Sequence, residues 1–144
     1  MPTDASTRGR QARAYGHETE RMAVRYLRDH GFPDACTTRS KLGTDGTRTP
    51  GDIDFAPGVA LEVKGVKRSG WPEWREQALR DAAGRVPLVL WRTRGVADVG
   101  FWRCQFLPID LELEPMRVVF CQRTRRTWGE ALFRGVVTEL AVHR

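Results

Sequence analysis

Apolar residues recur at helical spacing near the start of the chain. Within residues 17–30, Ala23, Val24 and Leu27 fall on one stripe of a helical wheel. Gly31 follows directly, at the position where many helices end in a left-handed residue. The pattern therefore predicts an amphipathic helix over residues 17–30.

The middle of the chain alternates with a period of two, as strands do. Between residues 51 and 65 one face is apolar, formed by Ile53, Phe55, Leu61 and Val63. Residues 56–58 read Ala-Pro-Gly and predict a tight turn between two short strands. The apolar run at residues 86–92 is typical of a central strand covered on both faces. Further strands are expected at residues 35–39, 99–107 and 116–122.

Two more helices are expected. One covers residues 72–83, where Pro72 occupies the favoured first turn and Gly84 follows the end. Its buried stripe would be Trp74, Ala78 and Ala82. Thr127 and Glu130 have the spacing of a capping box, which predicts a last helix with Trp128, Leu132, Val136 and Leu140 in register. The order helix, strand, strand, strand, helix, strand predicts an α/β fold with a mixed central sheet flanked by helices.

The basic composition of the chain indicates a polyanionic partner. The chain of 144 residues is long enough for one domain with a substantial core, and we assign residues 1–144 to it. Lys and Arg outnumber Asp and Glu by 24 to 18, so the formal charge is +6. Residues 1–14 are small, polar and basic, which predicts a mobile arm that is either a solvated tail or a contact to phosphate.

The cysteines and the hydropathy bear on the compartment. Cys36, Cys104 and Cys121 are odd in number, widely spaced and without histidines at zinc-ligand spacing, so we expect buried thiols in a reducing cytoplasm. No apolar run is long enough to span a bilayer, and the N-terminus has no hydrophobic signal region. We therefore expect a cytoplasmic protein with no membrane partner.

The second face of residues 51–65 is charged, with Asp52, Asp54, Glu62 and Lys64. The turn is expected to pair Asp54 with Glu62 and Asp52 with Lys64, so that three carboxylates and one ammonium converge. Crowded carboxylates repel unless a cation lies among them, and Mg²⁺ prefers oxygen ligands of this kind. Lys64 would then position a water for attack on phosphorus. The alternative is an edge hairpin with solvated charges.

Glu20 is a second unusual carboxylate. It lies three and four residues before Ala23 and Val24, so it falls on the apolar stripe of its helix and needs a partner. An ion pair with Arg28 or Arg39 is the structural alternative to a role in the site. Glu18 is the fallback for such a role.

The stretch GDID followed by LEVK resembles the PD-(D/E)xK nuclease motif, with Gly51 where the motif has proline. The whole chain is similar to small Holliday junction resolvase-like endonucleases, including the phage-encoded kind. The resemblance implies a restriction-endonuclease-like core of order αβββαβ. It also implies a Mg²⁺-dependent DNA endonuclease, with Mn²⁺ able to substitute, that acts on branched DNA such as a four-way junction. Its relatives are homodimers, and a phage-encoded protein would work in the cytosol of its bacterial host.

The resemblance also assigns roles to residues. It implies a catalytic set of Glu20, Asp52, Glu62, Lys64 and Gln77, in which Gln77 orients Lys64 or a water. The implied metal ligands are Asp52, Glu62 and the Val63 carbonyl, with Asp54 as the alternative to Asp52.

Exposed basic residues near this set are the candidates for binding DNA phosphate: Lys41, Arg48, Lys67, Arg68, Arg92 and Arg94. Two surfaces are candidates for a dimer interface. One is the last helix, with Trp128, Leu132 and Val136, which would otherwise cover its own sheet. The other is the strand over residues 116–122, with Val118 and Phe120.

Two other functions stay open at this point. One is a nuclease with another substrate, of restriction, nicking or single-strand type. The other is a nucleic-acid-binding module without turnover, against which the clustered carboxylates argue because they repel phosphate.

Overall fold

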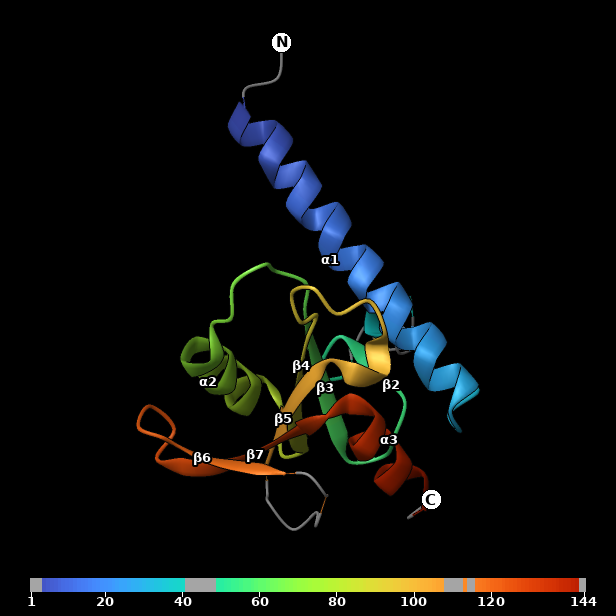
Figure 1. Cartoon of the computed structure of the whole chain (residues 1–144), viewed down its shortest axis with the longest axis vertical. Coiled ribbons are helices and arrows are strands. Elements are labelled where there is room, and N and C mark those ends of the chain that lie inside the picture. The colour runs from blue at the N-terminus through green and yellow to red at the C-terminus, as the bar shows by residue number, and fades with distance from the viewer. Residues whose placement is uncertain (1–3, 41–48, 108–112, 114–115, 143–144) are drawn as a thin grey trace.

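The computed structural model describes residues 4–40, 49–107, 113 and 116–142 of the chain. Within these residues the protein is mixed α/β, with three α-helices around a seven-stranded mixed sheet (Figure 1). The helices are α1 (Asp4–Asp29), α2 (Trp71–Asp81) and α3 (Phe133–Val142). The strands are β1 (Cys36–Thr37), β2 (Ile53–Asp54), β3 (Val59–Lys64), β4 (Val86–Trp91), β5 (Arg103–Phe106), β6 (Arg117–Cys121) and β7 (Arg126–Leu132). Short 3₁₀ turns cover Thr38–Ser40 and Val99–Phe101.

The sheet has the strand order β1-β2-β3-β4-β5-β7-β6. Only β3 and β4 pair in parallel among the described strands, and α2 connects them. As predicted, β4 is a central strand with side chains buried on both faces. Leu88 and Leu90 join the larger core under α1 and α3, whereas Val89 joins a smaller core under α2. The helices therefore cover both faces of the sheet.

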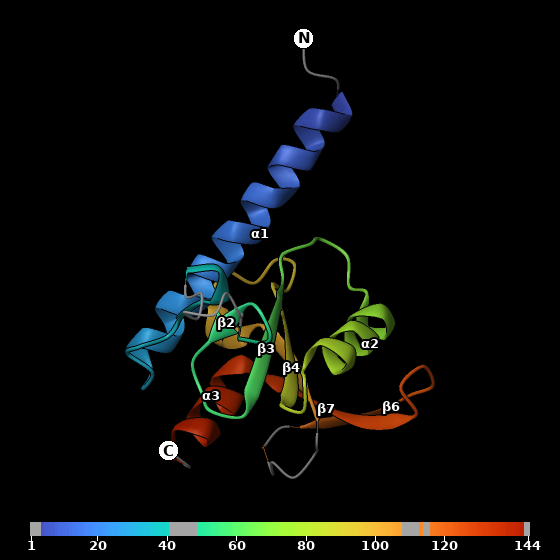
Figure 2. The same ribbon diagram turned by 180° about the vertical axis from the view of Figure 1, so that it is seen from behind.

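The expected helix at residues 17–30 is confirmed as the second half of α1, and Gly31 follows it with φ of +104°. A mobile arm was expected over residues 1–14, and the structure gives residues 4–14 as the first turns of the same helix. These residues include three alanines, three arginines and a glutamine, all strong helix formers, so propensity extends the helix without a buried face. Figures 1 and 2 show this half of α1 projecting beyond the sheet.

The β2–β3 hairpin has a different register from the expected one. Pro57 and Gly58 do form the predicted turn, closed by the Val59 amide donating to the Ala56 carbonyl at 3.3 Å. However, Ile53 pairs with Leu61, so the same register places position 52 opposite 62 and position 54 opposite 60. The expected pairs, 54 with 62 and 52 with 64, are therefore wrong by two residues. The connection spans residues 55–58, one more than the turn signal indicated.

The C-terminal region also corrects a prediction. Thr127 and Glu130 do not open a helix, because residues 126–132 form β7 between β5 and β6. Pairing with both neighbours satisfies the backbone more completely than a local capping box does. Trp128 is consequently buried under α2, and α3 begins only at Phe133.

Other expectations hold with small shifts. The strand expected at residues 35–39 is β1, two residues long, and the one expected at 99–107 is a 3₁₀ turn followed by β5. Cys104 and Cys121 are buried and Cys36 is half-buried, and all three are free thiols. No helix in the described part of the chain is long and apolar enough to cross a membrane.

Candidate active site

Asp52, directly before β2, lies next to Glu62 of β3. The Asp52 amide donates to the Leu61 carbonyl at 2.7 Å, and the Val63 amide donates to Oδ2 of Asp52 at 2.8 Å. Because the N–H and C=O of one strand residue point to the same side, the Val63 carbonyl also faces Asp52. Two carboxylates and one carbonyl thus gather at one point of the sheet.

The Glu62 carboxyl is buried, with 8% of the residue exposed. Burial raises its pKa to about 7, and the charge of Asp52 and a hydrogen bond shared with it add to the rise, whereas Lys64 opposes it. Glu62 therefore carries a proton over part of the neutral range when no cation is bound.

Gly51, where the PD-(D/E)xK pattern has proline, is required by the backbone. Its φ is +89°, which proline cannot adopt. A Cβ there would lie 2.8 Å from both the amide nitrogen and the carbonyl oxygen of Leu61. The missing side chain lets the strand approach β3 closely and brings Asp52 to the Val63 amide. The departure from the pattern thus has a structural reason.

Lys64 lies two residues after Glu62 on the same face of β3, which is covered by α2. Its Nζ donates to Oε1 of Gln77 on α2 at 2.7 Å. The helix therefore fixes the direction of the ammonium beside Glu62. The structure brings Gln77 to Lys64, as the resemblance implied.

Glu20 reaches the same region from α1. The helix packs tightly on the end of β3, where a Cβ on Gly65 would lie 2.6 Å from Oγ1 of Thr19. Oε2 of Glu20 accepts a hydrogen bond from Arg39 at 2.6 Å, so the predicted alternative partner is the one found. Burial raises the pKa of Glu20. The negative charge of Asp52 raises that pKa further, whereas Arg39 lowers it.

The register does not bring three carboxylates together on the hairpin, so that expectation is wrong. Asp54 lies in β2, opposite position 60 rather than beside Glu62, and it pairs with Cys36 of β1. No group of three or more His, Cys, Asp or Glu side chains able to hold a metal ion is found among the described residues. The geometry favours Asp52 over Asp54 as the partner of Glu62.

The predicted phosphate-binding residues fall into three groups. Lys41 and Arg48 lie outside the described residues. Lys67, Arg68 and Arg94 are exposed in the connections that follow β3 and β4. Tyr15, Lys67 and Arg94 line one groove of about 380 Å³ together with Arg92.

Arg92, the remaining candidate, is held by α1. Its guanidinium lies 4.1 Å from the ring centroid of Tyr15, donates to Oγ1 of Thr19 at 3.1 Å and lies 3.6 Å from Glu18. These contacts give Arg92 a part in joining α1 to the end of β4. They also engage Glu18, the fallback for Glu20.

Sequence reasoning missed His17, whose Nε2 lies 2.7 Å from Nη1 of Arg39. Its position three residues before Glu20, on the same side of the helix, was the available signal. It also missed the polar pair beneath α2, where buried Arg75 donates to Oε1 of buried Gln105 at 2.7 Å. No sequence signal joins residues 75 and 105, because only the packing of α2 on the sheet brings them together.

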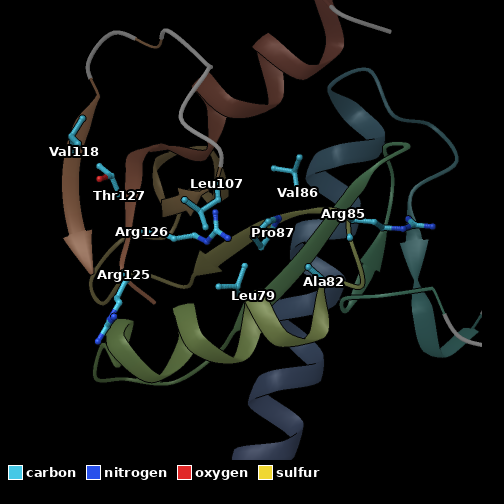
Figure 3. A pocket seen from close by; sticks show the side chains of 11 residues that line it. Leu79, Ala82, Arg85, Val86, Pro87, Leu107, Val118, Arg125, Arg126 and Thr127 are labelled. Atoms are coloured by element: carbon cyan, nitrogen blue, oxygen red, sulfur yellow. The ribbon is translucent and has the colours of Figure 1, made fainter. Parts of the chain in front are cut away.

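A larger cavity of about 880 Å³ lies elsewhere, between the end of α2, the start of β4 and the β6–β7 hairpin (Figure 3). Arg126 points into it, whereas Arg85 and Arg125 point away from its centre. Its floor is apolar, with Leu79, Pro87 and Leu107. None of the candidate catalytic residues lines it.

No protein family, curated protein or solved structure matches the chain.

Proposed function

We propose that the protein is a Mg²⁺-dependent DNA endonuclease of the PD-(D/E)xK kind that acts on branched DNA, as Holliday junction resolvases do. The observation that carries this proposal is the pairing of Asp52 with a buried Glu62 beside an ammonium, Lys64, that Gln77 holds. A structural hairpin gains little from burying a carboxyl against a like charge, because each such contact is destabilising. The site residues therefore favour a role in chemistry.

The donor set fits a hard divalent cation. Asp52, Glu62 and the Val63 carbonyl supply the oxygen ligands that Mg²⁺ takes, together with water and substrate phosphate. A cation would remove the repulsion that raises the pKa of Glu62. When bound, Mg²⁺ supplies Lewis-acid stabilisation of charge on the phosphate. Mn²⁺ has similar ligand preferences and is expected to substitute.

The side chains around this set have distinct proposed roles. Lys64 orients the attacking water and stabilises negative charge that develops on phosphorus-bound oxygen. Gln77 keeps the ammonium directed toward the carboxylates by accepting its hydrogen bond. Glu20 lies on the Asp52 side and completes the site through water, with Arg39 balancing its charge.

The order of the elements in the fold supports this proposal. From α1 to β4 the elements run helix, strand, strand, strand, helix, strand, which is the order expected for a restriction-endonuclease-like core. The proposed site lies at β2 and β3, between α1 and α2. We propose that these elements are that core.

Action on a four-way junction requires two incisions, so we propose a homodimer with one site per chain. The first expected surface is used internally, since Trp128 lies in β7, Val136 lies in α3, and both side chains are fully buried. Strand β6 lies at one edge of the sheet, and its residues Val118 and Phe120 are 56% and 57% exposed. Edge strands with exposed apolar side chains pair readily with another chain, which favours β6 as the dimer contact.

The deciding experiment is incubation of a labelled four-way junction and its matching duplex with the protein, with and without Mg²⁺. We expect paired nicks in the junction only with Mg²⁺, and none with Asp52→Asn. Cleavage of duplex or single strands instead would support a restriction-type, nicking or single-strand enzyme. Binding without any cleavage would contradict the enzyme proposal and support a binding module.

A further inference from the structure

The N-terminal half of α1 offers a surface that the proposed site does not use. None of residues 4–14 is buried, and this half projects at the end of the molecule where the 65–70 and 92–98 connections lie (Figures 1 and 2). Eleven helical residues span about 16 Å at the usual rise of ~1.5 Å per residue. The projecting segment carries three arginines against one aspartate.

Two of these arginines lie on the same side of the helix as His17 and Glu20. Arg10, Arg13, His17 and Glu20 are spaced by three, four and three residues, the spacing of neighbours along one helix face. The direction of that face is given by two contacts, because His17 and Glu20 both touch Arg39. Arg13 therefore lies one turn beyond His17, and Arg10 a further turn out. We call Arg10 and Arg13 the α1 basic stripe.

We infer that the α1 basic stripe binds the phosphate backbone of the DNA arm that leads away from the candidate active site. This inference rests on the proposed function, because it takes Glu20 as the point where the stripe meets the site. Both arginines are exposed and can pair with phosphate oxygens, the contact for which a guanidinium is best suited. At ~3.4 Å per base pair, the projecting helix reaches about five base pairs along the duplex.

DNA fits this surface better than a protein partner does. Protein interfaces have a core of apolar or aromatic side chains, and residues 4–14 hold none larger than alanine and threonine. What the segment offers is positive charge on a regular, extended support. Such contacts carry no base information, so a duplex of scrambled sequence should bind equally well.

The test measures binding of a labelled duplex by fluorescence anisotropy, without divalent cation, over a series of salt concentrations. Arg10→Ala with Arg13→Ala should weaken binding and flatten the slope of log K against log salt by about one to two units. Both changes favour the helix, and circular dichroism would verify that it persists. An unchanged slope would overturn the inference.

A matched control separates position from net charge. The variant Arg10→Ala, Gln11→Arg, Arg13→Ala, Ala14→Arg keeps the charge of the natural chain but turns both arginines about 100° around the helix. If the stripe is the contact, this variant should lose about as much affinity as the double alanine variant. Natural affinity in the relocated variant would show that only net charge matters and would overturn the inference, as would tighter binding of an RNA duplex with the same dependence on the stripe.

The proposed function can fail separately. If cleavage depends on Asp52 but the relocated variant binds like the natural chain, the inference about the α1 basic stripe is wrong and the proposed nuclease activity stands. If the stripe governs binding but no cleavage occurs under any condition, the stripe stands and the nuclease is wrong.

Discussion

Nζ of Lys64 on β3 donates a 2.7 Å hydrogen bond to Oε1 of Gln77 on α2, thirteen residues further along the chain. Lysine has three donors on a flexible stem, so a single amide acceptor on a rigid helix restricts where the charge can lie. The same face of β3 carries Glu62 two residues earlier. The relationship makes Gln77 a positioning residue for the proposed reaction.

Gln77→Ala should therefore lower kcat by about ten- to a hundredfold with little change in KM, as loss of an orienting partner typically does. Gln77→Glu keeps an acceptor oxygen and should recover part of the rate. Glu76→Ala, on the exposed side of the same turn, is the control and should leave kcat unchanged. An equal loss in Glu76→Ala would mean that disturbance of α2, not the contact to Lys64, is being measured.

Glu62 should make the free protein less stable as pH rises. Its pKa is raised from the ordinary 4.5 to about 7, so the folded state holds the proton more tightly than the unfolded state does. The contribution of Glu62 to stability is therefore greatest below pH 4.5 and is lost as pH rises through about 7. Glu62→Gln should remove this loss. Its free energy of unfolding relative to that of the natural chain should be up to about 3 kcal/mol higher above pH 7 than at acid pH. Denaturant unfolding across pH measures it.

A companion variant tests the cause. Asp52→Asn removes the charge that helps to raise the pKa of Glu62, so its loss of stability should move to lower pH. A Glu62→Gln protein whose stability difference from the natural chain does not change with pH would contradict the burial of Glu62.

Cation binding should be linked to the same proton. Because Glu62 must be ionised to serve as a ligand, Mg²⁺ should raise the melting temperature more at pH 8 than at pH 6. Asp52→Asn and Glu62→Gln should each abolish this shift and the cleavage, while DNA binding stays equal or becomes tighter. Asp54→Asn is the matched control, and it should keep both the shift in melting temperature and the cleavage. Loss of the shift in Asp54→Asn alone would make Asp54 the ligand.

Gly51 gives a prediction about the motif itself. Gly51→Ala combines a positive φ with a Cβ placed 2.8 Å from the Leu61 backbone, so it should cost about 3 kcal/mol or more. Gly51→Pro, which would match the PD-(D/E)xK pattern, should be worse. Gly58→Ala is the control, with φ of +74° but nothing within 4 Å of the added Cβ, and should cost about 1 kcal/mol. Equal losses in the thermal denaturation of the two alanine variants would contradict the close approach at Gly51.

The dimer proposal is tested on β6. Phe120→Lys places a charge on the exposed edge strand and should raise the dimer Kd by about tenfold or more. Val142→Lys changes another exposed apolar residue, on α3, and should leave it unchanged. Sedimentation over a range of concentrations measures both. A natural chain that is monomeric alone and on a junction would remove paired incision and favour a nicking or single-strand enzyme.

The sequence by itself determined much of this protein. Periodicity predicted the second half of α1, the two strands of the central hairpin, β4 and α2, because each of these has a local apolar pattern that its burial then satisfies. The same alternation placed Glu62 and Lys64 on one face of a strand, since side chains two residues apart always share a face. The pattern therefore contained the chemistry of the candidate site, and the nuclease assignment built on it stays a prediction.

Only the tertiary structure decided how these pieces meet. The register that puts Asp52 beside Glu62 depends on the close approach at Gly51, which a turn signal cannot specify. Residues 126–132 became β7 because two neighbouring strands outweighed a capping box, and Arg39 reached Glu20 across nineteen positions. Contacts between distant residues depend on how whole elements pack, whereas the sequence patterns reported only on neighbours along the chain.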